Sequence, residues 1–102
     1  MTYQDVCAQG HIAPGHSLAV RISGQDVALF NVNGVIHAIE NACPHMGSAL
    51  SGGCISGRTV ACPAHGLRFD VTTGAHVSSP ALTVPTFPVR IVDGRVLVSV
   101  AG

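Results

Sequence analysis

The chain is 102 residues long, and its five arginines balance five acidic residues, so the formal net charge is zero. A chain of this length forms one domain with a single modest core. Neutrality argues against nucleic-acid binding, which favours a basic surface. The longest apolar runs are only a few residues, too short to cross a membrane. Nothing at the N-terminus resembles a secretory signal peptide, and we expect reduced cysteines and a cytoplasmic location.

Short apolar strands alternate with turn signals toward both ends of the chain. After an early strand around Cys7, the sequence predicts strands at 18–22, 26–31 and 35–40, and two more at 89–92 and 96–100. Asn33-Gly34 and Asp93-Gly94 predict type I′ hairpins, because both central positions of that turn need positive φ. β-Branched residues dominate and no segment has a 3.6-residue period, so we predict an all-β fold.

The middle of the chain differs in composition from both ends because it is rich in glycine. Glycines interrupt any long strand between about residues 42 and 80, at Gly47, Gly52, Gly53, Gly57, Gly66 and Gly74. We predict a small subdomain here, inserted between strands of a larger antiparallel β-sandwich or barrel. Three of these glycines, Gly47, Gly66 and Gly74, are expected to hold tight turns.

Two short motifs inside this segment carry the chemistry. Cys43-Pro44-His45 is followed, after 16 residues, by Cys62-Pro63-Ala64-His65. Thiolate sulfur and imidazole nitrogen suit zinc, iron or an iron–sulfur cluster, whereas magnesium and calcium prefer oxygen. In each motif the Cys comes first and the His second. That repeated order suits a two-iron cluster in which both Cys bind one iron and both His bind the other.

Residues 41–80 resemble Rieske ferredoxins and Rieske domains. The matching pieces are Cys43-Pro44-His45-Met46-Gly47, Leu50-Ser51-Gly52-Gly53, Cys62-Pro63-Ala64-His65-Gly66 and Arg68-Phe69-Asp70-Val71-Thr72-Thr73-Gly74. A weaker likeness continues through 85–89. The resemblance implies a single Rieske domain over 1–102, with a cluster-binding subdomain at about 42–80. It also implies one Rieske-type [2Fe–2S] cluster, with Cys43, His45, Cys62 and His65 as its ligands.

The resemblance further implies a function in electron transfer. A freestanding chain of this size looks like the ferredoxin component of a bacterial multicomponent oxygenase system. Such a protein is not itself an enzyme. It carries single electrons from a flavin-dependent NADH reductase to a terminal non-haem iron oxygenase, often one acting on aromatic compounds. We expect a monomer.

Two alternatives remain open at this point. Two Cys and two His can form a structural zinc site, although zinc ligands are usually spaced C-x-x-C and H-x-x-x-H beside a helix, and no helical pattern surrounds His65. The small subunit of assimilatory nitrite reductase has a similar Rieske-like fold, and some members lack the ligands. The presence of all four ligands here favours the carrier.

The same resemblance bears on the reduction potential. High-potential Rieske proteins carry an extra Cys in each loop, at places held here by Ser48 and Ala64. They also place a Ser and a Tyr where this chain has Leu67 and Phe69. Fewer hydrogen bonds to the cluster sulfurs stabilise the reduced state less, so we predict a potential of about −150 mV.

The other notable side chains have plainer interpretations. We expect Cys7 in the core and Cys54 as a buried or incidental thiol. We expect the other histidines on the surface or on strand faces, at His11, His16, His37 and His76. Asp70 is a candidate for a polar network under the cluster.

The docking surface is the least constrained by the sequence. We expect apolar side chains around the histidine tip, at Met46, Leu50, Leu67, Pro80 and Ala81. Because the chain is neutral, we expect partner reduction to depend weakly on ionic strength. We also expect cluster loss to disorder 43–74 before the base sheets, because a metal cross-link replaces a missing core there.

Overall fold

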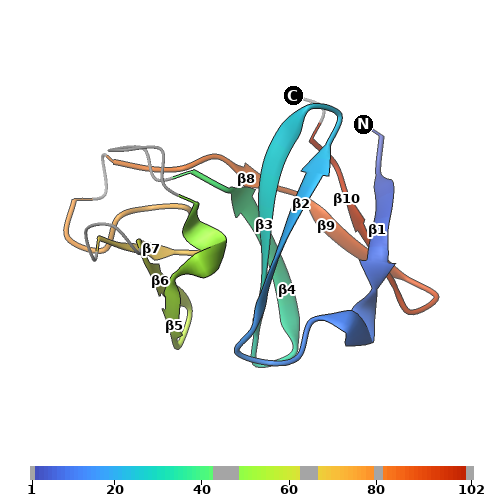
Figure 1. Cartoon of the computed structure of the whole chain (residues 1–102), viewed down its shortest axis with the longest axis horizontal. Helices are drawn as coiled ribbons and strands as arrows, with labels where there is room; N and C mark the ends of the chain where they lie inside the picture. Colours follow the sequence, from blue (N-terminus) through green and yellow to red (C-terminus); the bar gives the residue numbers. More distant parts are fainter. Residues whose placement is uncertain (1, 43–48, 63–66, 80–81, 101–102) are drawn as a thin grey trace.

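A computed structural model describes residues 2–42, 49–62, 67–79 and 82–100. Its strands form three antiparallel sheets, ordered β1–β10–β9, β2–β3–β4–β8 and β5–β6–β7. Figure 1 shows the first two sheets together on the right and the third in a smaller lobe on the left. The predicted all-β architecture is confirmed.

The elements are short. The strands are β1 (Gln4–Ala8), β2 (Ser17–Ile22), β3 (Gln25–Val32), β4 (Val35–Glu40), β5 (Cys54–Ser56), β6 (Thr59–Ala61), β7 (Arg68–Asp70), β8 (Thr86–Phe87), β9 (Val89–Val92) and β10 (Arg95–Val98). Two 3₁₀ turns, η1 (Gln9–His11) and η2 (Leu50–Gly52), complete the described elements.

Both predicted hairpins have the expected backbone. Asn33 and Gly34 have φ of 53° and 91°, and Asp93 and Gly94 have φ of 50° and 74°. A third turn of this kind, between β2 and β3, has positive φ at Ser23 and Gly24. The sequence did not predict it as such, because Ser lacks the strong left-handed preference of Asn and Asp.

The two larger sheets pack face to face as a sandwich. Side chains of β3 and β4, including Val27, Leu29 and Ala38, meet Val96 and Val98 of β10 in one apolar cluster. All five are at most 2% exposed. The predicted sandwich base is therefore confirmed.

The opposite face of β3 is buried as well. Ala28 and Phe30, which alternate with Val27 and Leu29, pack in a second apolar cluster that the small lobe completes. The lobe contributes Leu50, Val60, Cys62, Phe69 and Val71 to it. The expectation that this segment lacks a core is wrong, because its apolar side chains use β3 and β4 of the base as the other wall.

Two glycines allow the lobe to close tightly. A Cβ at Gly53 would lie 1.9 Å from the carbonyl oxygen of Ala61. Gly74 has φ of +79°, and a Cβ there would lie 2.1 Å from the carbonyl oxygen of Val84. The turn expected at Gly74 is confirmed, whereas Gly47 and Gly66 lie outside the described residues. Within the described part of the chain, no helix has the length and apolar character needed to cross a bilayer.

Candidate metal centre

Cys62 is the one predicted ligand that the structure describes, since Cys43, His45 and His65 lie outside the described residues. It follows β6, is 1% exposed, and packs beside Leu50, Val60 and Phe69. Apolar burial disfavours a bare thiolate, whereas direct ligation to a metal stabilises it. The position and chemistry of this thiol therefore fit a thiolate ligand of an iron–sulfur cluster. With three ligands outside the described residues, those residues contain no group of three metal-binding side chains.

The first ligand loop is closed at its base by Asn41 and Ser51. The Asn41 side chain accepts a hydrogen bond from the Ser51 N–H at 2.9 Å and donates one to Ser51 Oγ at 3.0 Å. Ser17 anchors the same position by donating its hydroxyl hydrogen to the Ser51 carbonyl. On the other side, the Asn41 N–H donates to the Asp26 carbonyl at 2.9 Å, which ties the loop to β3. The chain on both sides of 43–48 is thus held by hydrogen bonds to the base sheet and across the loop.

The second ligand loop is closed in the same manner. The Cys62 N–H donates to the Leu67 carbonyl at 2.7 Å, where β6 ends and β7 is about to begin. The flanking strands are in register, with Ala61 opposite Arg68 and Val60 opposite Phe69. Residues 63–66 therefore connect two strands whose separation is set by sheet pairing.

A third loop, around residues 80–81, is also closed at its base. The Leu82 N–H donates to the Ser79 carbonyl, and the His76 N–H donates to the Leu82 carbonyl, both at 2.8 Å. The residues that flank all three loops lie at the same end of the molecule, on the left in Figure 1. The sequence did not predict these three closures.

His76 stabilises the approach to the third loop. Its Nδ1 accepts hydrogen bonds from the N–H groups of Ser78 and Ser79, at 3.1 and 3.0 Å. Its ring packs edge-on against Phe69, with ring centroids 5.3 Å apart. A neutral imidazole whose Nδ1 accepts must carry its proton on Nε2. This half-buried loop histidine orders the backbone, a role that no ligand spacing in the sequence could indicate.

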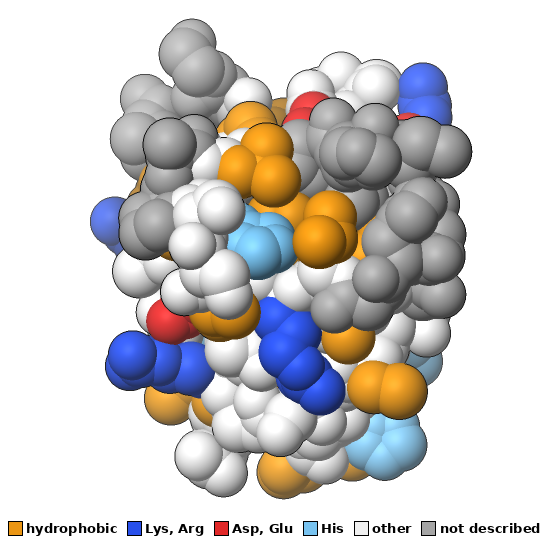
Figure 2. All heavy atoms as spheres, turned by 90° about the vertical axis from the view of Figure 1, so that its left-hand side faces the viewer, with side chains coloured by type: hydrophobic (Ala, Val, Ile, Leu, Met, Phe, Trp, Pro, Cys, Tyr) orange, Lys and Arg blue, Asp and Glu red, His pale blue; other side chains and the backbone are white. Residues whose placement is uncertain are grey.

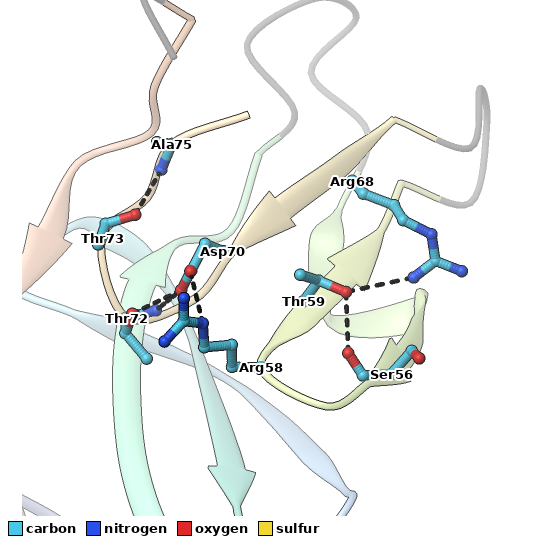
Figure 3. Close-up of polar contacts among 8 residues, drawn as sticks. All are labelled: Ser56, Arg58, Thr59, Arg68, Asp70, Thr72, Thr73 and Ala75. Carbon is cyan, nitrogen blue, oxygen red and sulfur yellow. Dashed lines mark hydrogen bonds and ion pairs between the residues drawn. The ribbon is translucent and has the colours of Figure 1, made fainter. Parts of the chain in front are cut away.

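Asp70 is the centre of a polar network at the end of β7, shown in Figure 3. It lies 3.0 Å from Nε of Arg58, and Thr72 donates to its Oδ1 from both the backbone N–H and the hydroxyl group. Burial alone would raise the pKa of Asp70. The hydrogen bonds from Thr72, the charge of Arg58 and the amide of Thr73 outweigh it, so the pKa is lowered. A polar network at Asp70 therefore exists, and it ties the β5–β6 turn to the start of the Thr72-Thr73-Gly74 turn, whereas its expected position under the cluster stays a prediction.

A groove of about 470 Å³ separates this turn from the base sheets. It is lined by residues that include His37, Val71, Thr72 and Phe87. Burial lowers the pKa of His37, and the nearby negative charge of Asp70 opposes that shift. Cys62 does not line the groove.

The remaining predicted residues have mixed outcomes. His37 lies on the lobe-facing side of β4, while His11 and His16 are exposed. Cys7 lies on β1 and packs against the sandwich core, and burial raises its pKa. Cys54 is exposed, so of the two alternatives given for it the buried thiol is wrong and the incidental thiol remains.

Leu50 does not belong to the docking surface that the sequence suggested. It is fully buried, because η2 turns it inward against the shared apolar cluster. Leu67 is half-buried and flanks the second loop. Met46, Pro80 and Ala81 lie outside the described residues.

Comparison with known proteins places this geometry in a family. The model of the Rieske [2Fe-2S] domain matches residues 2–88. The chain is 37% identical over 98 residues to the ferredoxin component of the naphthalene 1,2-dioxygenase system of Pseudomonas aeruginosa, covering 95% of this chain and 94% of that protein. It is 39% identical over 101 residues to the biphenyl dioxygenase ferredoxin subunit of Pseudomonas sp. strain KKS102, covering 96% and 92%.

Solved structures have the same fold. A chain in the complex of reduced oxygenase and oxidized ferredoxin of carbazole 1,9a-dioxygenase matches with a TM-score of 0.87 and 34% identity, over 94% of this chain and 100% of that one. A protein of Mycobacterium tuberculosis, assigned as an NADH-dependent nitrite reductase small subunit, matches with a TM-score of 0.89 and 32% identity, over 99% and 97%. From the fold, the closed loops and these near-full-length similarities together, the chain belongs to the Rieske [2Fe-2S] family, as a ferredoxin that carries electrons on one [2Fe–2S] cluster and is not a catalyst.

Proposed function

We propose that this ferredoxin carries single electrons from a flavin-dependent NADH reductase to a terminal non-haem iron oxygenase that acts on an aromatic substrate. The observation that carries the proposal is its similarity, over nearly its whole length, to ferredoxin components of aromatic dioxygenase systems. The structure of a relative was solved as a complex of ferredoxin and oxygenase, which supports the same kind of partner for this chain. The relatives serve different substrates, so the substrate class proposed here is no narrower than aromatic compounds.

We assign Cys43, His45, Cys62 and His65 as the ligands. When bound, the cluster supplies one-electron redox chemistry, with neutral His ligands raising its potential above that of all-Cys clusters. The chain's own contribution is to hold the ligand loops. The Asn41–Ser51 and Cys62–Leu67 contacts fix the four ends from which the ligands extend. Because these contacts already hold the ends of each loop together, the entropy of closing the loops is not lost again when the ligands bind, which stabilises the loaded state.

The shared apolar cluster supports the deeper side of the site. Phe69 and Leu50 are fully buried in the same apolar cluster as Cys62, which is itself 1% exposed. Neither side chain offers a hydroxyl group to a cluster sulfur. Leu67 and Phe69 occupy the places where high-potential Rieske proteins carry hydroxyl donors to the cluster sulfurs, which supports the low potential expected from the sequence.

The domain organisation follows from this arrangement. We propose a single Rieske domain over 1–102 in which about 42–80 forms the cluster-binding subdomain. We also propose a monomer in the cytoplasm. Cys7 and Cys54 are free thiols, which suits a reducing compartment.

A second candidate function is that of a nitrite reductase small subunit. The close structural match to the protein of Mycobacterium tuberculosis favours it. The complete set of four ligands in the sequence favours the carrier instead, because a redox-active cluster is what a carrier requires.

Reconstitution of electron transfer with purified components distinguishes the oxygenase electron carrier from the nitrite reductase small subunit. The holo-ferredoxin would be mixed with NADH and with the reductase and oxygenase of a naphthalene dioxygenase system. Substrate-dependent NADH consumption that requires the ferredoxin supports the carrier. A fully loaded ferredoxin that the reductase does not reduce, together with tight association with a nitrite reductase large subunit, would overturn it. An electron paramagnetic resonance spectrum of the dithionite-reduced protein establishes beforehand that the cluster is present.

A further inference from the structure

The charges of this neutral chain are unevenly distributed. The segment 42–80 contains Arg58, Arg68 and Asp70, a net charge of +1, and the rest of the chain contains three Arg and four acidic residues, a net charge of −1. The expectation of weak salt dependence rested on the total and took no account of this separation. Figure 2 views the lobe end directly and shows positive side chains exposed on it, with little acidic surface.

The small sheet β5–β6–β7 has one apolar and one polar face. Val60 and Phe69 are opposite each other and fully buried in the shared apolar cluster. Because side chains alternate along a strand and paired residues share a face, Ala61 and Arg68 lie on the other side. Arg68 is exposed there, directly after the second ligand loop.

The guanidinium of Arg68 is held in place. Its Nη1 donates to Thr59 Oγ1 at 3.3 Å, and the Thr59 hydroxyl in turn donates to the Ser56 carbonyl at 2.9 Å (Figure 3). The β5–β6 turn thus orients the cation. A held cation loses less side-chain entropy on docking than a freely rotating one.

The two arginines of the lobe differ in their ion pairing. Arg58 is paired with Asp70, so its charge is locally balanced. For Arg68, the described part of the chain provides no acidic partner, only the neutral Thr59 hydroxyl. The net positive charge of the lobe is therefore that of Arg68.

Arg68 is close to the electron-transfer site. Its Cα is paired with Ala61, the residue before Cys62, and it is three residues beyond the assigned ligand His65. Three residues of extended chain span at most about 11 Å. That is roughly one Debye length at physiological ionic strength, so the charge acts on whatever approaches the histidine side.

We propose that Arg68 is the electrostatic docking contact of this ferredoxin, and that its protein redox partner presents a carboxylate-rich surface around the point of electron entry. The inference rests on the proposed electron-carrier function. The buried face of the sheet fixes which side Arg68 occupies, Thr59 orients it, and the absence of an ion pair leaves its charge available to the partner.

Charged small-molecule oxidants test this without the partner. The reduced holoprotein transfers one electron to trianionic hexacyanoferrate(III) or to tricationic hexaammineruthenium(III), and stopped-flow absorbance gives both rates at low ionic strength. We expect Arg68→Gln to lower the ratio of the anion rate to the cation rate by roughly twofold to fivefold. Arg68→Lys should retain most of the ratio.

The matched control is Arg95→Gln. It removes the same charge at the opposite end of the 37 Å long axis, next to the β9–β10 hairpin on the right in Figure 1. Its ratio should stay within experimental error of the wild-type value. Equal ratios for Arg68→Gln and Arg95→Gln would overturn the proposal. Cluster absorbance and midpoint potential are recorded for the wild type and for every variant. A wild-type protein that binds no cluster would refute the carrier function itself, whereas unchanged absorbance and potential in a variant assign its altered ratio to the lost charge.

Discussion

Asn41 and Ser51 are joined by two hydrogen bonds, of 2.9 and 3.0 Å, across the base of the first ligand loop. An amide side chain that both accepts and donates can replace a rung of backbone pairing where no strand is present. Asn41 directly follows the end of β4, so the contact ties the end of the base sheet to Ser51, ten positions further along the chain. The predictions below start from this contact.

Replacing Asn41 with Ala should weaken cluster retention. The change removes both hydrogen bonds and leaves the Ser51 N–H without its acceptor, which costs about 1–3 kcal/mol. We expect the visible absorbance to decay several-fold faster in the presence of an iron chelator. Gln25→Ala is the control, because it removes a half-buried side-chain hydrogen bond to Glu40 within the base sheet. Equal decay rates for the two variants would contradict a specific role for Asn41.

Replacement of a ligand cysteine should remove the cluster, whereas replacement of a cysteine that is not a ligand should leave it in place. Cys62→Ala is expected to abolish the cluster, because it removes a buried thiolate ligand. Cys54→Ala changes an exposed residue of β5 and should bind iron and sulfide at wild-type levels. Iron, sulfide and zinc analysis of the purified proteins checks this. Zinc in place of iron and sulfide in the wild-type protein would argue for a structural metal site.

The midpoint potential should lie at the low end of the Rieske range, about −150 mV. Leu67→Ser introduces a hydroxyl group at the place where high-potential relatives carry one, so it should raise the midpoint. Leu82→Ser is the matched control, since Leu82 is also a half-buried leucine packed on the shared apolar cluster. Potentiometric titration gives all three values, and a wild-type midpoint well above zero would contradict the argument.

Gly74→Ala should be strongly destabilising. The new methyl group would meet the Val84 carbonyl at 2.1 Å, at a residue whose φ is positive. Gly57→Ala shares the positive φ but meets open space, so it should cost only the conformational term of roughly 1–2 kcal/mol. We expect Gly74→Ala to lose a further 1 kcal/mol or more, on the order of other overpacking changes. Urea unfolding followed by circular dichroism measures the difference.

The Asp70 network should make stability depend on pH. Because the folded-state pKa of Asp70 is lowered, its stabilisation is present above the unfolded pKa of about 3.9 and is lost as pH falls through the folded pKa. Asp70→Asn should therefore have a lower free energy of unfolding than wild type at pH 7. This stability gap between variant and wild type, measured by urea unfolding at a series of pH values, should narrow below about pH 4. Asp26→Asn, which alters an ion pair exposed on both sides, should show a much smaller gap. A gap that is constant across this range would contradict the role of the Asp70 charge.

Much of the fold was predictable because its signals are local. Asn33-Gly34 and Asp93-Gly94 dictate their turns through backbone sterics alone, and alternating β-branched residues mark the strands beside them. Burial of β3 on both faces was not predictable. Val27 and Ala28 are both apolar, and only the tertiary structure shows that one faces the sandwich and the other the small lobe.

The site was predictable only where residue chemistry is specific. Cys and His at fixed spacing indicate a metal centre, whereas Asn41, Ser51 and His76 act through contacts that depend on how distant segments meet. The exposure of Cys54 was left open for the same reason. Cys54 lies on β5, an edge strand of the small sheet, and the sequence alone does not say which side chains of such a strand face solvent.

The apolar cluster shared by Phe30 of the base and Phe69 of the lobe has a mechanical consequence. Two bodies that bury a common, close-packed set of side chains cannot pivot about their connections without opening a void between them. The described parts of the base and the lobe therefore move as one body. Changes in distance and orientation during turnover have to come from whole-molecule tumbling and re-docking, so viscosity should slow the exchange of partners more than it slows the electron transfer within a docked pair.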